Sequence, residues 1–190
     1  MLSSDEAREL LKGMDVSTVA GLRDRALIAV MTYTFARVGA AVRLKVENYY
    51  AQKKRWWLRL HQKNGKLNEM PCHHNLEAYL DEYIEAAGIA RDRRGPLFRS
   101  AIGKTGKLSG SGMSRTDVWY MVRGRASDAG IESPIGRHTF RATGITDYLK
   151  NGGRIEVAQR MAGHSNAKTT GLYDRRGDDV SLDEVERIGI

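Results

Sequence analysis

The 190-residue chain contains a single cysteine, Cys72, and no apolar run as long as the roughly 18 residues needed to cross a bilayer. One cysteine excludes an internal disulfide and a cysteine-rich zinc cluster, and it is typical of proteins in a reducing compartment. Residues 1–6 are polar and acidic, unlike the basic and apolar start of a secretory signal peptide. We therefore expect a cytoplasmic protein that neither spans a membrane nor is secreted.

Positive charge exceeds negative charge: 31 lysines and arginines against 23 aspartates and glutamates give a net charge of +8 and a pI near 9.7. This excess favours a polyanionic partner that is captured by electrostatic attraction. Many basic proteins bind no nucleic acid, so charge alone leaves both possibilities open. Apolar residues at 41% and charged residues at 28% are ordinary for a protein with one substantial core.

Capping signals and apolar spacing predict mostly helical structure. Ser3 and Glu6 form a capping-box pattern before the first helix, and residues 26–31 are an apolar run that predicts a helix buried on most sides. Gly88 ends a helix whose apolar stripe has steps of three and four. The predicted helices after the first cover about residues 22–34, 76–87, 115–129, 138–149 and 155–161, the segment with Tyr173, and a stretch after Ser181.

Two extended runs, residues 56–60 and 67–70, flank the Asn64-Gly65 pair, which is a strong signal for a tight turn. They predict a small antiparallel sheet. The predicted fold class is therefore mainly α with a small antiparallel β-sheet (α+β). No internal repeat is present, and one domain over residues 1–190 is expected.

Residues 101–114 contain four glycines together with Lys104 and Lys107. They predict a flexible basic loop, which either contacts a DNA backbone or is merely mobile. The run Cys72-His73-His74 invites a metal-binding interpretation, but adjacent side chains seldom converge on one ion. The end of a strand followed by the start of a helix is the favoured interpretation there.

The residues best suited to chemistry gather toward the C-terminal end. Cationic side chains can hold a phosphate while a hydroxyl attacks it, so these residue types together can cut a phosphodiester without a metal. Each of them taken alone is more often structural, and only their joint occurrence indicates a site. The pieces are His138-x-x-Arg141, Gly163-His164-Ser165, Tyr173 and, far upstream, Arg37.

The order Arg, Lys, His-x-x-Arg, Gly-His, Tyr resembles that of the tyrosine recombinases, the phage-integrase family. The resemblance runs from about Leu2 to the end of the chain. Its most specific part is the segment from His164 to Tyr173, with the paired Thr169 and Thr170 between them. It implies an integrase-like catalytic domain for site-specific DNA recombination or integration.

The resemblance also implies a role for each residue. Tyr173 attacks a DNA phosphate and forms a 3′-phosphotyrosyl link, which keeps the energy of the broken bond, so no cofactor is expected. A free tyrosine has a pKa of about 10, and His138 is the implied acceptor of its proton. Arg37 and Arg141 hold the non-bridging oxygens with paired N–H groups, and His164 donates a further hydrogen bond.

Recombinases of this family place a catalytic lysine in the β-hairpin, where it protonates the departing 5′ oxygen. Lys63, directly before Asn64-Gly65, is the better match, and Lys66 is the alternative. No metal ligand is assigned. The residues expected to bind DNA are Lys66, Lys104, Lys107, Arg115, Arg137 and Lys168.

Two departures from the family pattern are evident. Ala40 stands where the family commonly has an acid that buttresses the site, three places after the first arginine. The helical DNA-binding domain that integrases carry upstream is absent, so we expect a catalytic domain, either excised from a longer protein or a natural fragment. It should bind double-stranded DNA weakly through phosphate contacts. We expect a monomer when free and a homotetramer on DNA.

Two other functions stay open. A type IB topoisomerase shares the chemistry but relaxes supercoils, although the compact spacing from His164 to Tyr173 is more similar to that of an integrase. A non-catalytic DNA-binding remnant is compatible with Ala40 and the missing domain. The resemblance further implies a prokaryotic or phage-encoded protein associated with the nucleoid, without a small-molecule substrate.

Overall fold

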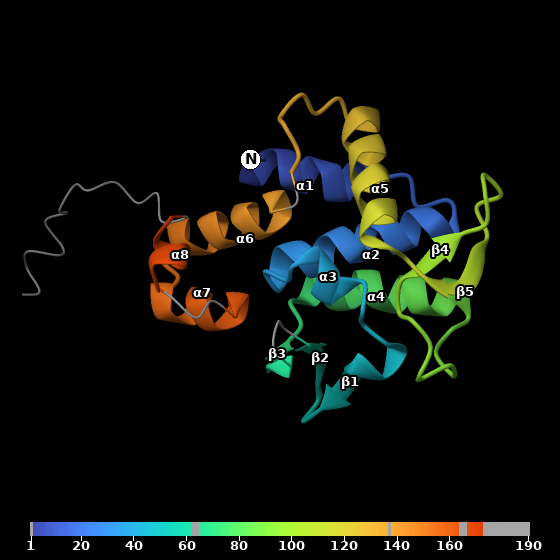
Figure 1. Cartoon of the computed structure of the whole chain (residues 1–190), viewed down its shortest axis with the longest axis horizontal. Helices are drawn as coiled ribbons and strands as arrows, with labels where there is room; N and C mark the ends of the chain where they lie inside the picture. Colours follow the sequence, from blue (N-terminus) through green and yellow to red (C-terminus); the bar gives the residue numbers. More distant parts are fainter. Residues whose placement is uncertain (1, 62–64, 137, 164–166, 173–190) are drawn as a thin grey trace, which may run out of the picture.

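The computed structural model describes residues 2–61, 65–136, 138–163 and 167–172. Helices dominate and the strands form small antiparallel sheets, so the predicted fold class is confirmed (Figure 1). The elements are α1 (Ser4–Gly13), α2 (Val19–Tyr33), α3 (Val38–Ala41), η1 (Val46–Asn48), β1 (Tyr49–Gln52), β2 (Arg55–His61), β3 (Leu67–Pro71), α4 (His74–Ala87), β4 (Arg99–Ala101), β5 (Leu108–Gly112), α5 (Arg115–Asp128), α6 (Thr139–Lys150), α7 (Ile155–Ala162) and α8 (Ala167–Gly171).

Helix α2 is the central element, and α4 and α6 pack against it (Figure 1). Its residues 26–30 are at most 1% exposed, because the run from 26 to 31 is apolar on all sides of the helix rather than along one stripe. Thr18 caps its first turn by accepting a hydrogen bond from the amide of Gly21 at 3.1 Å. The helix therefore begins three residues before the predicted start at Leu22.

Strands β1, β2 and β3 form one antiparallel sheet with β2 in the middle. Leu58 pairs with Tyr49 on one side and with Met70 on the other, and all three side chains are buried. One face of the sheet therefore covers the core. The predicted hairpin of β2 and β3 is confirmed, β1 is an additional strand, and the turn at residues 62–64 lies outside the described residues.

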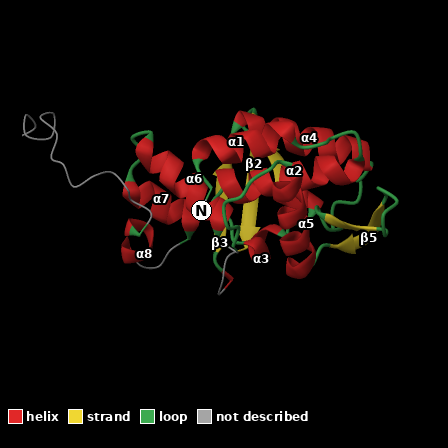
Figure 2. Cartoon of the chain, turned by 90° about the horizontal axis from the view of Figure 1, so that it is seen from above, coloured by secondary structure: helices red, strands yellow, loops and turns green. Residues whose placement is uncertain are grey.

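The prediction of a flexible loop over residues 101–114 was wrong. Strands β4 and β5 form a second antiparallel pair at the end of the molecule opposite to α7 and α8 (Figure 2). Gly103 and Gly106 have φ angles of 53° and 73°, so they supply the left-handed conformations of a hairpin turn rather than a linker. Lys104 and Lys107 are exposed on this turn.

The sequence predicts that Ser114 caps this helix and that Val118, Met121, Val122 and Ala129 form its buried stripe, and the structure confirms this only in part. Val118 and Val122 are buried as expected, and Ser114 caps the helix in a capping box with Asp117. Ala129 is exposed because the helix ends one residue before it, and Ala126 is buried instead.

A buried ion cluster holds α5 on α2. Asp24 is 2% exposed, and one of its oxygens, Oδ1, accepts hydrogen bonds from Arg23 at 2.6 and 2.9 Å. Its other oxygen, Oδ2, accepts from Arg125 of α5 at 2.8 and 3.0 Å. Arg23 also donates to the carbonyl of Arg99 in β4 at 2.7 Å. Asp24 thus fixes α5 on α2, and Arg23, which it holds in place, fixes β4.

We predict that Asp24→Asn lowers the free energy of unfolding by about 3–5 kcal/mol, because it leaves two guanidinium groups without their shared carboxylate. Urea denaturation followed by circular dichroism measures this change. Asp128→Asn is the matched control, since Asp128 is exposed and lies 3.9 Å from the same Arg125; its effect should stay below about 0.5 kcal/mol. Equal losses in the two variants would refute the role given to Asp24.

Candidate active site

The chain turns sharply between α2 and α3 and thereby sets the position of Arg37. Phe35 has a φ of 54°, a left-handed conformation that costs a non-glycine residue about 1 kcal/mol or more. Arg37 follows as the N-cap residue of α3, half-buried, with an extended backbone. A strained residue two places before a candidate catalytic arginine indicates that the position of this arginine is built into the fold.

Helix α6 holds this turn by packing against it. Phe35 is 3% exposed, and its ring meets Tyr148 edge-on at 6.0 Å between ring centroids. A Cβ atom added at Gly144 would come within 2.1 Å of the Thr32 carbonyl oxygen and 3.0 Å of the Phe35 ring. Gly144 therefore permits a close approach of α6 to the end of α2 that any other residue would prevent.

Arg141 of α6 joins the same turn to the end of α7. Its side chain is buried, Nη1 donates to the carbonyl of Phe35, and Nη2 donates to the carbonyl of Ala162 at 2.6 Å. These bonds are charge-assisted and so stronger than bonds between neutral groups. Ala162 is the last residue of α7 and lies two residues before His164. Arg141 thus links the backbone segments that lead to two other predicted site residues.

The β-hairpin with the predicted lysines is tied to the same place. Asn68 of β3 donates through Nδ2 to the carbonyl of Met161 at 2.8 Å. Lys66 is exposed just before β3, and Lys63 belongs to the turn outside the described residues. The hairpin therefore rests against the C-terminal end of α7.

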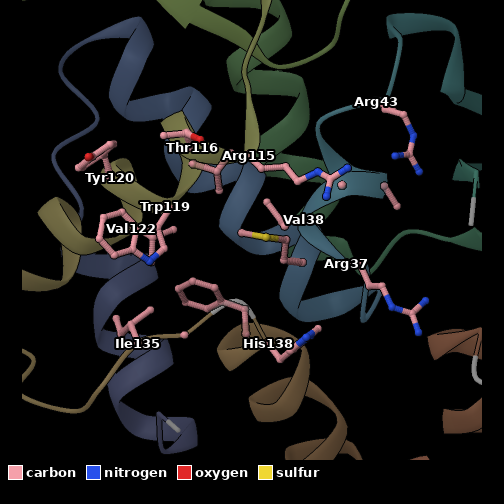
Figure 3. A pocket seen from close by; sticks show the side chains of 16 residues that line it. Arg37, Val38, Arg43, Arg115, Thr116, Trp119, Tyr120, Val122, Ile135 and His138 are labelled. Atoms are coloured by element: carbon pink, nitrogen blue, oxygen red, sulfur yellow. The ribbon is translucent and has the colours of Figure 1, made fainter. Parts of the chain in front are cut away.

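A pocket of 960 Å³ opens beside Arg37 (Figure 3). Residues of α3, of α5 and of the segment leading into α6 line it, and Arg43, Arg115 and His138 contribute cationic or ionisable side chains. None of the described residues that line it is acidic. Guanidinium groups repel one another unless an anion lies between them, so the pocket suits a ligand with several negative charges.

Two of these guanidinium groups meet over the short helix α3. A Cβ atom added at Gly39 would lie 3.3 Å from Nε of Arg115 and 3.5 Å from Nη1 of Arg43. Ala40, in the position where the family has an acid, lines the same pocket and is 4% exposed. Its methyl group supplies no countercharge to the guanidinium groups of Arg43 and Arg115.

The structure brings Arg37 and His138 into one pocket, as the sequence analysis expects, and adds Arg115 from the DNA-binding set. His138 is exposed and is the N-cap residue of α6. Lys66, Lys104 and Lys107 are exposed away from the pocket lining. Four predicted site residues and one side chain lie outside the described part: Tyr173, His164, Lys63, Arg137 and the side chain of Lys168.

The pocket lining also contains Arg43, Trp119 and Tyr120, which were not predicted from the sequence. A signal for the aromatic pair exists, since Trp119 stands four residues after Arg115 and four before Arg123 on a predicted helix. Residues at this spacing share one face. Nothing local in the sequence distinguishes Arg43, which reaches the pocket only through the packing of α3 on α5.

The alternative of a metal site at Cys72 finds no support. No group of three or more His, Cys, Asp or Glu side chains that could hold a metal occurs within the described ranges. His73 instead caps α4 by accepting from the amide of Asn75 at 3.1 Å, and burial together with the neighbouring His74 lowers its pKa. Burial raises the pKa of the Cys72 thiol to about 12, so the thiol stays protonated at neutral pH.

No helix in the described ranges combines the length and apolar character of a membrane span.

The helical fold with its small antiparallel sheets is the one expected for the family that the sequence resembles. The model of the phage integrase family matches residues 1–178, and the chain belongs to this family. The tyrosine recombinase XerD of Listeria innocua is 31% identical over 173 residues, which cover 91% of this chain and 57% of the relative. XerD of Staphylococcus aureus is 29% identical over 175 residues with the same coverage. The chain thus spans little more than half the length of these relatives.

Solved structures share the fold. The XerH site-specific recombinase in its post-cleavage complex with a palindromic difH substrate matches with a TM-score of 0.72 and 21% identity, over 90% of this chain and 48% of that one. The catalytic domain of bacteriophage HP1 integrase matches with a TM-score of 0.62 and 19% identity, over 91% of this chain and 85% of that one. The expectation of an integrase-like catalytic fold is therefore confirmed.

We predict that Gly144→Ala destabilises the protein by about 1–3 kcal/mol, because the new methyl group overlaps the Thr32 carbonyl and forces α6 away from the turn at Phe35. Thermal unfolding measures the loss. Gly124→Ala is the matched control: it lies inside α5 with no atom near its added Cβ, and it should stabilise the protein by about 0.5–1 kcal/mol. A neutral Gly144→Ala variant would contradict the close approach.

Proposed function

We propose that this chain is the catalytic domain of a site-specific tyrosine recombinase, which cleaves and rejoins DNA strands through a 3′-phosphotyrosyl intermediate. The observation that carries the proposal is the pocket that Arg37 and His138 share, in which none of the described lining residues is acidic. Arg141 lies outside this lining and holds the turn before Arg37 by donating to the carbonyl of Phe35. Membership of the phage integrase family and the XerD relatives support this function over relaxation by a type IB topoisomerase.

In the proposed reaction the phenol oxygen of Tyr173 attacks the scissile phosphorus, and the bond from phosphorus to the 5′ oxygen breaks. His138 accepts the phenol proton, since ionising a tyrosine of pKa about 10 at pH 7 otherwise costs roughly 4 kcal/mol. Lys63 gives a proton to the departing 5′ oxygen, with Lys66 as the alternative. The reverse steps join the phosphate to a different 5′ hydroxyl.

The guanidinium of Arg37 and the imidazole of His164 stabilise the charge that grows on the non-bridging oxygens during attack. Arg141 serves the same phosphate and, through Phe35 and Ala162, holds the segments that carry these two residues. Two arginines neutralise what a divalent cation neutralises in other phosphoryl-transfer sites, so we propose a reaction without a metal or cofactor.

We further propose the partners and the setting of this domain. It acts on double-stranded DNA, is a monomer when free, and forms a homotetramer when two duplexes are brought together. The residues proposed to contact the DNA backbone are Lys66, Lys104, Lys107, Arg115, Arg137 and Lys168. The cytoplasm of a prokaryotic cell, at the nucleoid, is the proposed location.

We predict that the chain forms a covalent complex with a nicked suicide substrate and that Tyr173→Phe abolishes it, because only the phenol oxygen can form the link to phosphorus. Denaturing gel electrophoresis of labelled DNA measures the trapped product. Tyr50→Phe is the control, since Tyr50 lies on β1 and donates to Glu69 instead; trapping should persist in it. Trapping by the Tyr173→Phe variant would contradict the assignment of Tyr173 as the nucleophile. If the unaltered chain forms no covalent complex, a non-catalytic remnant is favoured instead.

We predict that the affinity of this chain for duplex DNA falls steeply with salt, because phosphate contacts dominate it and each one releases a condensed counterion. A plot of log Kd against log salt concentration should have a slope of several units, and the free chain should sediment as a monomer under the same conditions. A nanomolar complex insensitive to salt, or a stable tetramer without DNA, would contradict the proposed mode of binding.

A further inference from the structure

Helix α5 carries two adjacent aromatic side chains that the core does not use. Trp119 is 39% exposed and Tyr120 is 67% exposed, and their rings meet edge-on at 5.0 Å between centroids. Large apolar side chains contribute to folding when they are buried, so an exposed and contiguous pair of rings indicates a surface that another molecule covers.

Guanidinium groups flank these rings. The Cζ atom of Arg123 lies 4.6 Å from the centroid of the Trp119 ring, a cation–π arrangement that holds both side chains in place. Arg115 precedes Trp119 by one helical turn, so cationic and aromatic side chains alternate along one face of α5. This combination is the one that binds single-stranded nucleic acid, in which cations follow the phosphates and aromatic rings stack on bases.

The aromatic pair belongs to the same pocket as the candidate catalytic residues. Trp119 and Tyr120 line its wall on α5, and Arg37 and His138 line the opposite part (Figure 3). A ligand that reaches Arg37 through a phosphate can therefore place a neighbouring group against the rings.

We propose that Trp119 and Tyr120 form a stacking surface for an unpaired nucleobase next to the scissile phosphate. The proposal rests on the proposed strand-cleaving function. After cleavage, the strand that ends in the 5′ hydroxyl has to leave its duplex before it can join another one, so the nucleotides beside the break lose their paired and stacked neighbours. A protein ring that replaces the lost stacking lowers the cost of this step.

Charge favours DNA over a second copy of this chain as the molecule on this surface. Arg123 lies over the Trp119 ring, and Arg37, Arg43 and Arg115 line the same pocket as the pair. None of the described residues lining the pocket is acidic. The whole chain has a net charge of +8, so a second copy would bring like charge to the pocket. A polyanion with exposed aromatic bases complements both the positive charge of the pocket and the exposed rings of Trp119 and Tyr120.

A double-mutant cycle between protein and DNA tests the proposal. The affinity of the full chain is measured by fluorescence anisotropy for a duplex with a short single-stranded gap, and each gap nucleotide is replaced in turn by an abasic residue. We expect Trp119→Ala to weaken binding about tenfold when all bases are present, and to have almost no effect when the abasic residue occupies the stacking position. Trp119→Phe should keep most of the affinity, since it keeps a ring.

Ile102→Ala is the control, because Ile102 is 50% exposed on the β4–β5 hairpin, away from the pocket lining; it should bind as the unaltered chain does. If Trp119→Ala fails to fold, as judged by circular dichroism, Tyr120→Ala takes its place in the cycle. A loss that is the same for intact and abasic DNA at every position overturns the proposal, and so does evidence from sedimentation that the unaltered chain self-associates through Trp119.

The covalent-trapping assay separates this inference from the proposed function. If the unaltered chain traps nicked DNA but the cycle shows no coupling, the stacking surface is wrong and the recombinase function stands. Coupling in the cycle without any trapping would support the surface as a binding site and contradict catalysis.

Discussion

The two hydrogen bonds that Arg141 donates to backbone carbonyls are the interaction on which the site depends. One reaches Phe35, two residues before Arg37, and the other reaches Ala162, two residues before His164. A buried guanidinium that lost these acceptors would keep an unsatisfied charge in an apolar setting, which is costly. Arg141 therefore holds the end of α2 and the end of α7 in a fixed relation to α6, whatever it also does for a phosphate.

Local backbone strain and close packing accompany this bond. The left-handed conformation of Phe35 is unfavourable by itself, and two contacts with α6 offset this. The Phe35 ring is buried against Gly144, and the Phe35 carbonyl accepts a hydrogen bond from Arg141. Asn68 extends the same arrangement to the β-hairpin through Met161. Motif segments that are far apart in the sequence thus become neighbours because Arg141, a motif residue, and Asn68 bind backbone carbonyls that lie beside the other motifs.

Much of the fold could be predicted because its signals are local. The capping box at Ser3, the cap at Ser114, the apolar run in α2 and the helix end at Gly88 each act within a few residues, and the structure confirms them. The β4–β5 hairpin was missed because glycines in a turn and glycines in a linker look alike without knowledge of strand pairing. Placing Arg37 beside His138 followed from the resemblance, whereas the carbonyl partners of Arg141 and the positions of Arg43 and Trp119 depend on how α3, α5 and α6 pack.

Because Ala40 supplies no negative charge to the pocket, the stability of the unliganded domain depends on the ionic strength of the solution. Arginines that face each other across the pocket repel, and mobile ions weaken this repulsion. Rising ionic strength therefore stabilises the ligand-free fold at the pocket, because it screens the repulsion between the arginines. The same rise weakens the binding of a polyelectrolyte such as DNA, so added salt has opposite effects on the free and the bound domain. The conditions under which the isolated domain is most robust are consequently those under which it is least able to hold its substrate.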